Sequence, residues 1–251
     1  MSSMDPASFL LDASRVEDAV GEINRRLANA KGPNPDVRYE ASDLPKASSL
    51  EELLERCDHG EPLWNGTLML LARETAKAAP TTLEVTSLDE LPAFDGEFIT
   101  RFHHGDLIVR GDFGAFESVW ITGSVRVEGV VEASYLDAYH DLMVGGDLRC
   151  RAIQFMGLSL IAGALEVERF AFVHSQGENW VLGGVRGPCL IGEYESVAGW
   201  DLSQVPDCVD LDESKLAQVA ALLGLSVEED DEHGFEPVLR AFDAARATAP
   251  E

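Results

Sequence analysis

The chain has 251 residues, of which 45 are acidic and 19 basic, so its formal net charge at pH 7 is −26. This charge disfavours binding to nucleic acids and to anionic membranes, and it favours a basic protein partner, although solubility alone would also account for it. No stretch approaches the roughly 18 consecutive apolar residues of a membrane span, and the N-terminus lacks the pattern of a secretory signal, so a cytoplasmic protein is expected.

Residues 1–82 are expected to form a helical segment that packs on the rest of the chain. One helical stripe gathers five apolar residues, namely Leu11, Val16, Val20, Ile23 and Leu27. The glycine and prolines at 31–35 end this helix, and a second helix is expected to begin at Ser48 or Ser49 and to stop near Gly60. The apolar run 64–72 fits either a helix or a strand.

A repeated motif dominates the middle of the chain, where a glycine recurs with apolar residues two positions before it and two positions after it. The glycines are Gly111, Gly123, Gly146, Gly163 and Gly183, with spacings of 12, 23, 17 and 20 residues. Such a recurrence is typical of a solenoid, in which each coil buries its apolar face against its neighbours. We therefore predict a mainly β protein, with a parallel β-solenoid over 83–195 and helical segments at both ends.

Residues 196–251 are expected to form a helical cap that carries an acidic loop. An amphipathic helix is predicted over 211–223, ending at Gly224, and a last helix around 235–242. The loop between them consists of Glu228, Glu229, Asp230, Asp231 and Glu232. Helices at this place would cover the unpaired strand edges at the end of a solenoid.

The register of the motif sorts its side chains into inward and outward positions, because side chains alternate across a strand. The inward residues, two before each glycine, are Val109, Ile121, Val144, Ile161 and Val181. The outward residues, three before each glycine, are also apolar: Ile108, Trp120, Met143, Leu160 and Trp180. Either the N-terminal helices cover this outward column, or it is a protein interface with tryptophan anchors. The candidate partner-binding residues are these five and the acidic loop 228–232.

Catalytic and metal-binding motifs are lacking. Four scattered cysteines, Cys57, Cys150, Cys189 and Cys208, indicate reduced and mostly buried thiols. Cys57-Asp58-His59 has no second ligand pair at zinc-site spacing. Trimeric left-handed β-helices can hold zinc or a catalytic histidine between subunits, but the chain around His103-His104 lacks their strict six-residue repeat. The chain has no nucleophile elbow and no phosphate-binding loop. We predict no catalytic residue, no metal and no cofactor, and we do not expect an enzyme.

The segments Gly105–Asp112 and His140–Leu148 resemble the coils of bacterial short-rung β-solenoid proteins, and the resemblance covers about a third of the chain, over 105–192. One such group is the bactofilin-like, polymer-forming scaffolds, whose flanks are short. The other is solenoid immunity proteins linked to polymorphic and type VI toxins, which have helical flanks. The second likeness implies an antitoxin, monomeric or homodimeric, that occludes a basic toxin by stoichiometric binding. A self-assembling scaffold and, less favoured, a β-helix enzyme are the alternatives.

Overall fold

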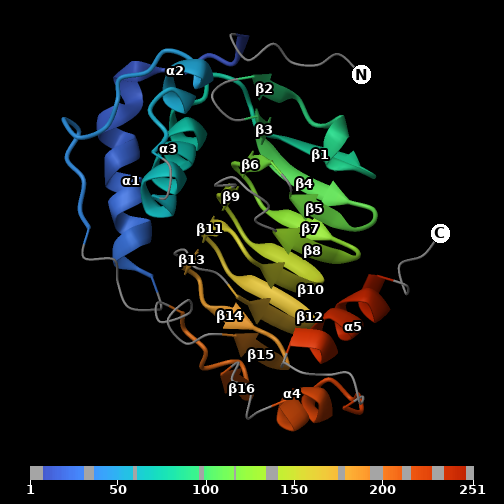
Figure 1. Ribbon diagram of the computed structural model, residues 1–251. Coiled ribbons are helices and arrows are strands. Elements are labelled where there is room, and N and C mark those ends of the chain that lie inside the picture. The colour runs from blue at the N-terminus through green and yellow to red at the C-terminus, as the bar shows by residue number, and fades with distance from the viewer. Residues whose placement is uncertain are drawn as a thin grey trace.

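The computed structural model describes residues 8–30, 37–58, 61–95, 99–115, 117–133, 141–174, 179–192, 200–210, 216–227 and 235–246. Its parallel strands form a β-solenoid of about five turns with helices towards both ends of the chain (Figure 1). The predicted fold class is therefore confirmed.

Three helices precede the strands. A short 3-10 turn, η2 (Ala13–Arg15), leads into α1 (Val16–Ala28), which is followed by α2 (Leu50–Leu54) and α3 (Pro62–Thr75). The side chains of Asp12 and Ser49 accept hydrogen bonds from the first backbone N–H groups of η2 and α2, and Pro62 lies in the first turn of α3. The apolar run 64–72 is thus helical, and it lacks a polar face because α3 packs between α1 and the strands.

The first sheet has six strands in the order β13-β11-β9-β6-β3-β2. All neighbouring pairs are parallel except β2 with β3. The strands are β2 (Ala93–Asp95), β3 (Ile99–His103), β6 (Ser118–Ile121), β9 (Asp141–Val144), β11 (Leu158–Ile161) and β13 (Asn179–Val181). In Figure 1, α1 and α3 lie beside this sheet and run along the stack of coils.

The second sheet wraps around two further sides of the solenoid. Its members are β1 (Thr81–Val85), β4 (Gly105–Val109), β5 (Phe113–Ala115), β7 (Val125–Val127), β8 (Val130–Ala133), β10 (Leu148–Phe155), β12 (Leu165–Val173), β14 (Val185–Arg186), β15 (Cys189–Gly192) and β16 (Asp207–Asp210). The first part of β10 pairs with β7 and the second part with β8. Its pairing with β12 has a register shift between Cys150 and Ala152. This shift marks the corner between the two sides.

The interior of the solenoid is filled by apolar side chains from all three sides. The five residues predicted to point inward, Val109, Ile121, Val144, Ile161 and Val181, belong to this core. Leu88 of the 3-10 turn η3 (Leu88–Glu90) and Leu91 extend it at the N-terminal end. At the other end Trp200 packs edge-on against Phe155, with 5.7 Å between ring centroids.

The C-terminal helices α4 (Leu216–Leu222) and α5 (Phe235–Arg246) build a separate apolar cluster outside the solenoid. In this cluster Phe242 of α5 packs against Phe170, and α5 contacts β8 and β10. Gly224 follows α4 with a φ of 71°, the left-handed conformation that commonly ends a helix. The second sheet is therefore covered by helix on its β8 side.

The glycine column differs at one position from the sequence prediction. Backbone N–H groups of Gly123, Gly163 and Gly183 donate to the carbonyls of Gly105, Gly146 and Gly163, at 2.8–2.9 Å. Gly111 instead accepts from Gly129 at another corner, so its assignment to the main column was wrong. In the main column a Cβ atom at Gly123, Gly163 or Gly183 would lie within 3 Å of the preceding coil's backbone, whereas a Cβ atom at Gly111 would meet its nearest atom only at 3.8 Å.

Polar residues after the glycines connect successive coils. Asp106 accepts a hydrogen bond from the N–H of Ser124, Ser124 accepts from Asp147, and Asp147 accepts from Ala164, at 2.8–3.2 Å. Asp112 accepts in the same way from Val130 at 2.9 Å. These side chains satisfy backbone donors at the turns.

Candidate functional site

Most of the predicted outward column is covered by the N-terminal helices. Trp120, Met143 and Leu160 are 1%, 0% and 0% exposed and pack in one cluster with α1 and α3. The interpretation in which the helices cover the column therefore holds for these residues, and they offer no surface to a partner in this structure. Trp180, on the last strand of the sheet, is half-buried at the border of the same cluster.

Ile108 does not belong to this column. It lies on β4 of the second sheet, where its neighbours in register are Glu84 and Arg126 rather than Trp120. Phe102 is the actual neighbour of Trp120. The error follows from Gly111, which marks a different corner, and the true coil around Gly105 was missed because His103 stands where the motif has an aliphatic residue.

The predicted acidic loop, Glu228, Glu229, Asp230, Asp231 and Glu232, lies outside the described residues. We call residues 201–251 the acidic end, because this segment has thirteen acidic and three basic residues. In its described part, Asp207 is exposed and the side chain of Asp243 is 81% exposed. Leu239 and Val227 are 47% and 44% exposed, so the described part of the acidic end exposes apolar as well as acidic side chains.

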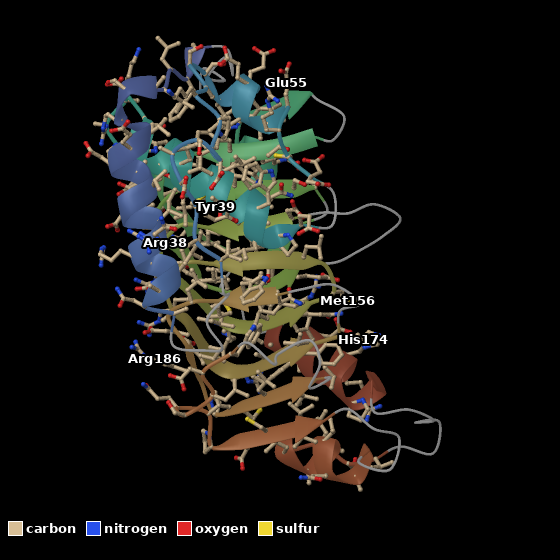
Figure 2. All side chains as sticks on the ribbon, turned by 90° about the vertical axis from the view of Figure 1, so that its left-hand side faces the viewer. Arg38, Tyr39, Glu55, Met156, His174 and Arg186 are labelled. Carbon is tan, nitrogen blue, oxygen red and sulfur yellow. The ribbon has the colours of Figure 1, made fainter. Side chains whose placement is uncertain are left out.

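The side of the solenoid formed by β1, β4, β7, β14 and the first parts of β10 and β12 carries interleaved charges. Arg110 forms ion pairs with Glu84, at 2.9 Å, and with Glu128. Arg186 pairs with Glu166 at 2.6 Å, and Arg149 with Glu168 at 3.8 Å. Exposed pairs of this kind contribute little to stability. Figure 2, seen from the side of the N-terminal helices, labels Arg186 in the lower half of the molecule, below these helices.

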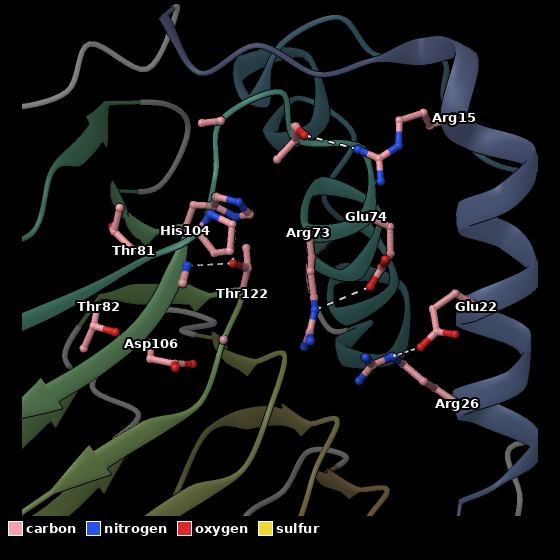
Figure 3. A pocket seen from close by; sticks show the side chains of 15 residues that line it. Arg15, Glu22, Arg26, Arg73, Glu74, Thr81, Thr82, His104, Asp106 and Thr122 are labelled. Atoms are coloured by element: carbon pink, nitrogen blue, oxygen red, sulfur yellow. Dashed lines mark hydrogen bonds and ion pairs between the residues drawn. The ribbon is translucent and has the colours of Figure 1, made fainter.

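A polar pocket, which we call the seam pocket, lies between the N-terminal helices and the solenoid (Figure 3). Its volume is about 550 Å³, and its lining includes Arg15, Arg26, Arg73, His104, Asp106 and Thr122. The guanidinium groups of Arg73 and Arg26 both donate to the carbonyl oxygen of Gly145, the latter at 3.4 Å. Burial and the cation of Arg26 lower the pKa of Arg73. The pocket thus brings two cations together.

The two histidines that precede Gly105 are buried and hydrogen-bonded. His103 Nε2 lies 3.1 Å from the carbonyl oxygens of Thr81 and Asp106, and it therefore carries the proton. His104 Nδ1 lies 2.9 Å from Thr122 Oγ1. Burial lowers the pKa of both imidazoles, and the Arg73 cation adds to this at His104.

Acidification is expected to destabilise the protein through these two histidines. The unfolded chain takes up protons near the ordinary histidine pKa of 6.5, whereas the folded chain resists protonation until lower pH. Their contribution to stability is therefore present above that pH and is lost as the pH falls below it. Urea unfolding from pH 7.5 down to pH 5.5 should show this loss, and the double variant His103→Gln, His104→Gln should show a shallower one. An equal pH dependence in both proteins would contradict the assignment.

The cysteines do not form an activated thiol site. All four are free thiols, as expected. Burial raises the pKa of Cys57 to about 12 and of Cys189 to about 11, and it also raises the pKa of Cys150 and Cys208. Thiols with such pKa values stay protonated at neutral pH and are poor nucleophiles.

Within the described ranges, no group of three or more histidine, cysteine, aspartate or glutamate side chains is placed to hold a metal ion. None of the helices that the structure describes combines the length and the apolar content needed to cross a bilayer.

No protein-family model, curated protein or solved structure matches the chain. The assignment of this protein as a parallel β-solenoid with helical flanks is therefore based on the strand pairing and helices of its own structure.

Proposed function

We propose that the protein is a binding module that forms a stoichiometric complex with a basic protein, and that the acidic end is its docking surface. The observation that carries this proposal is the charge of residues 201–251, where thirteen acidic residues stand against three basic ones. Opposite charge accelerates the encounter of two proteins and suppresses binding of acidic competitors.

Exposed apolar side chains in the acidic end support a specific interface rather than mere solubility. Leu239 of α5 and Val227 after α4 are about half exposed, while Val238 and Phe242 of the same helix are buried. Exposed apolar side chains add affinity when a partner buries them at the centre of an interface, whereas the surrounding charges set the association rate and the choice of partner. The acidic end replaces the buried outward column as the candidate surface.

The proposed partner is a toxin that the protein inhibits by occlusion. This part of the proposal rests on the likeness of the coils Gly105–Asp112 and His140–Leu148 to those of solenoid immunity proteins, joined to long helical flanks. An inhibitor of this type needs a rigid body that presents a surface, and it needs no catalytic group of its own. A fully packed solenoid core supplies such a body.

A self-assembling scaffold is less favoured, because the described edge strands at both ends of the second sheet carry exposed charged side chains. Glu84 is exposed on β1, the first strand in the sheet order, and Asp207 is exposed on β16, the last. Glu84 is paired with Arg110, so what matters is the presence of charges at both edges and not their sign. Charged side chains on edge strands disfavour edge-to-edge pairing.

The proposal is tested by comparing capture of partners from the native host by three tagged proteins. The wild type should retain one small basic protein. A variant in which Glu228, Glu229, Asp230, Asp231 and Glu232 are changed to the corresponding amides should retain about tenfold less of it, because the steering charge is lost. The control changes five exposed acids of the N-terminal segment, Glu17, Asp18, Glu40, Glu51 and Glu55, to amides.

The control variant has the same net charge as the test variant, so it separates a local surface from a general charge effect. Equal losses in both variants would contradict docking at the acidic end. For a purified complex, the association rate should fall steeply as salt is added. An association rate that does not respond to salt would contradict the electrostatic part of the proposal.

A further inference from the structure

We propose that the seam pocket binds a small phosphorylated polyol, such as a sugar phosphate, with its phosphate held by Arg26 and Arg73. The pocket involves α1, α3, β1 and β4, whereas the proposed docking surface belongs to the other end of the chain (Figures 1 and 3). This inference is therefore independent of the proposed function.

The arginines gather in a chain that is otherwise short of cations. Three of the 19 basic residues line this one pocket. Arg73 and Arg26 direct their guanidinium groups to the same carbonyl oxygen, that of Gly145, and Arg15 donates to the carbonyl of Ala76 at 3.4 Å. Each guanidinium keeps further N–H donors, and planar arginine groups match the geometry of phosphate oxygens.

The helix wall of the pocket holds more positive than negative charge. Glu22 is shared between Arg25 and Arg26, at 2.6 and 2.9 Å, and Glu74 lies 3.4 Å from Arg73. Three arginines that line the pocket, Arg15, Arg26 and Arg73, thus stand against two carboxylates on this wall. A phosphate monoester carries a charge of about −1.5 to −2 at pH 7, so it is expected to bind at the arginines of this wall rather than at the opposite wall, which holds Asp106.

The solenoid wall opposite the arginines is suited to hydroxyl groups. It presents Thr81, Thr82 and the carboxylate of Asp106, and the two threonines and Asp106 are exposed. A carboxylate and hydroxyls can accept and donate hydrogen bonds to a polyol. Apart from the His104 ring, no aromatic side chain lines the pocket, which gives a nucleobase little to stack on. A volume of about 550 Å³ is in the usual range of small-molecule sites.

The test is calorimetric titration of the full chain with glucose 6-phosphate, inorganic phosphate and glucose at constant ionic strength. Glucose 6-phosphate should bind more tightly than phosphate, and glucose alone should not bind. Arg73→Gln should weaken binding of glucose 6-phosphate by about tenfold or more, because a charge-assisted pair of hydrogen bonds is lost. Arg25→Gln is the matched control, since its side chain is 63% exposed and it does not line the pocket.

Thermal unfolding separates a ligand site from a structural contact. Arg73 ties α3 to Gly145, so Arg73→Gln is expected to lower the melting temperature in any case. If glucose 6-phosphate also raises the melting temperature of the wild type but not of Arg73→Gln, the proposal stands. If neither phosphate compound binds the wild type, or if both variants bind like the wild type, the proposal is overturned and the arginines only join the helices to the solenoid.

Discussion

Replacing Trp200 with alanine is expected to lower the free energy of unfolding by about 3–5 kcal/mol. Its side chain is 5% exposed and belongs to the solenoid core, where it packs against Phe155. The indole N–H also donates to the carbonyl of Asn179 at 2.9 Å. Alanine would leave a large cavity next to the last coils and remove this hydrogen bond. Urea unfolding followed by far-UV circular dichroism measures the change.

Trp64→Ala is the matched control for this experiment. Trp64 lies on α3, is half-buried and donates to the carbonyl of Arg56 at 2.8 Å, so it loses the same kind of hydrogen bond with less buried surface. Its effect should be clearly smaller than that of Trp200→Ala. If the two variants lost equal stability, Trp200 would not be the residue that completes the core at the C-terminal end.

Replacing Gly66 with alanine is expected to destabilise the protein by about 1–3 kcal/mol, because it overpacks the contact between α3 and the first sheet. A Cβ atom at this position would lie 2.6 Å from Cδ1 and 2.9 Å from Cβ of Leu160, which is fully buried. The sign of the change in the free energy of unfolding is informative, because replacing glycine with alanine within a helix usually stabilises a protein by about 0.5–1 kcal/mol.

Gly21→Ala is the control that measures how much alanine stabilises a helix relative to glycine where no clash arises. Gly21 lies within α1, and an added Cβ would meet no atom within 4 Å, so this variant should gain stability. Leu160→Ala tests the named contact, because the double variant with Gly66→Ala should lose less than the sum of the two single losses. A stabilising Gly66→Ala, or full additivity, would show that α3 does not approach β11 this closely.

The sequence predicts the solenoid because glycine and aliphatic side chains must recur wherever coils stack. Val109, Ile121, Val144, Ile161 and Val181 were correctly assigned to the interior, since alternation along a strand is a local property. The assignment of Gly111 failed because this glycine, with apolar residues two before and two after it, matches the motif although it lies at another corner, where Arg151 occupies the equivalent position of a later coil. Spacing alone does not tell which corner a glycine occupies.

The candidate site was less predictable, because surface exposure depends on which elements pack together. Trp120, Met143 and Leu160 have the side chains of an interface, but α3 covers them. The apolar run of α3 lacks the amphipathic pattern that would have indicated a covering helix. The seam pocket was missed because Arg26, Arg73 and His104 are distant in sequence and meet only through the packing of α1 and α3 on the first coils.

Light scattering of the purified chain, alone and mixed with the captured basic protein, tests the central claim most directly. Our account predicts a monomer or dimer that converts with its partner into a single complex of 1:1 or 2:2 stoichiometry. A chain that forms a polydisperse polymer by itself and no defined complex would contradict this account and would favour a self-assembling scaffold.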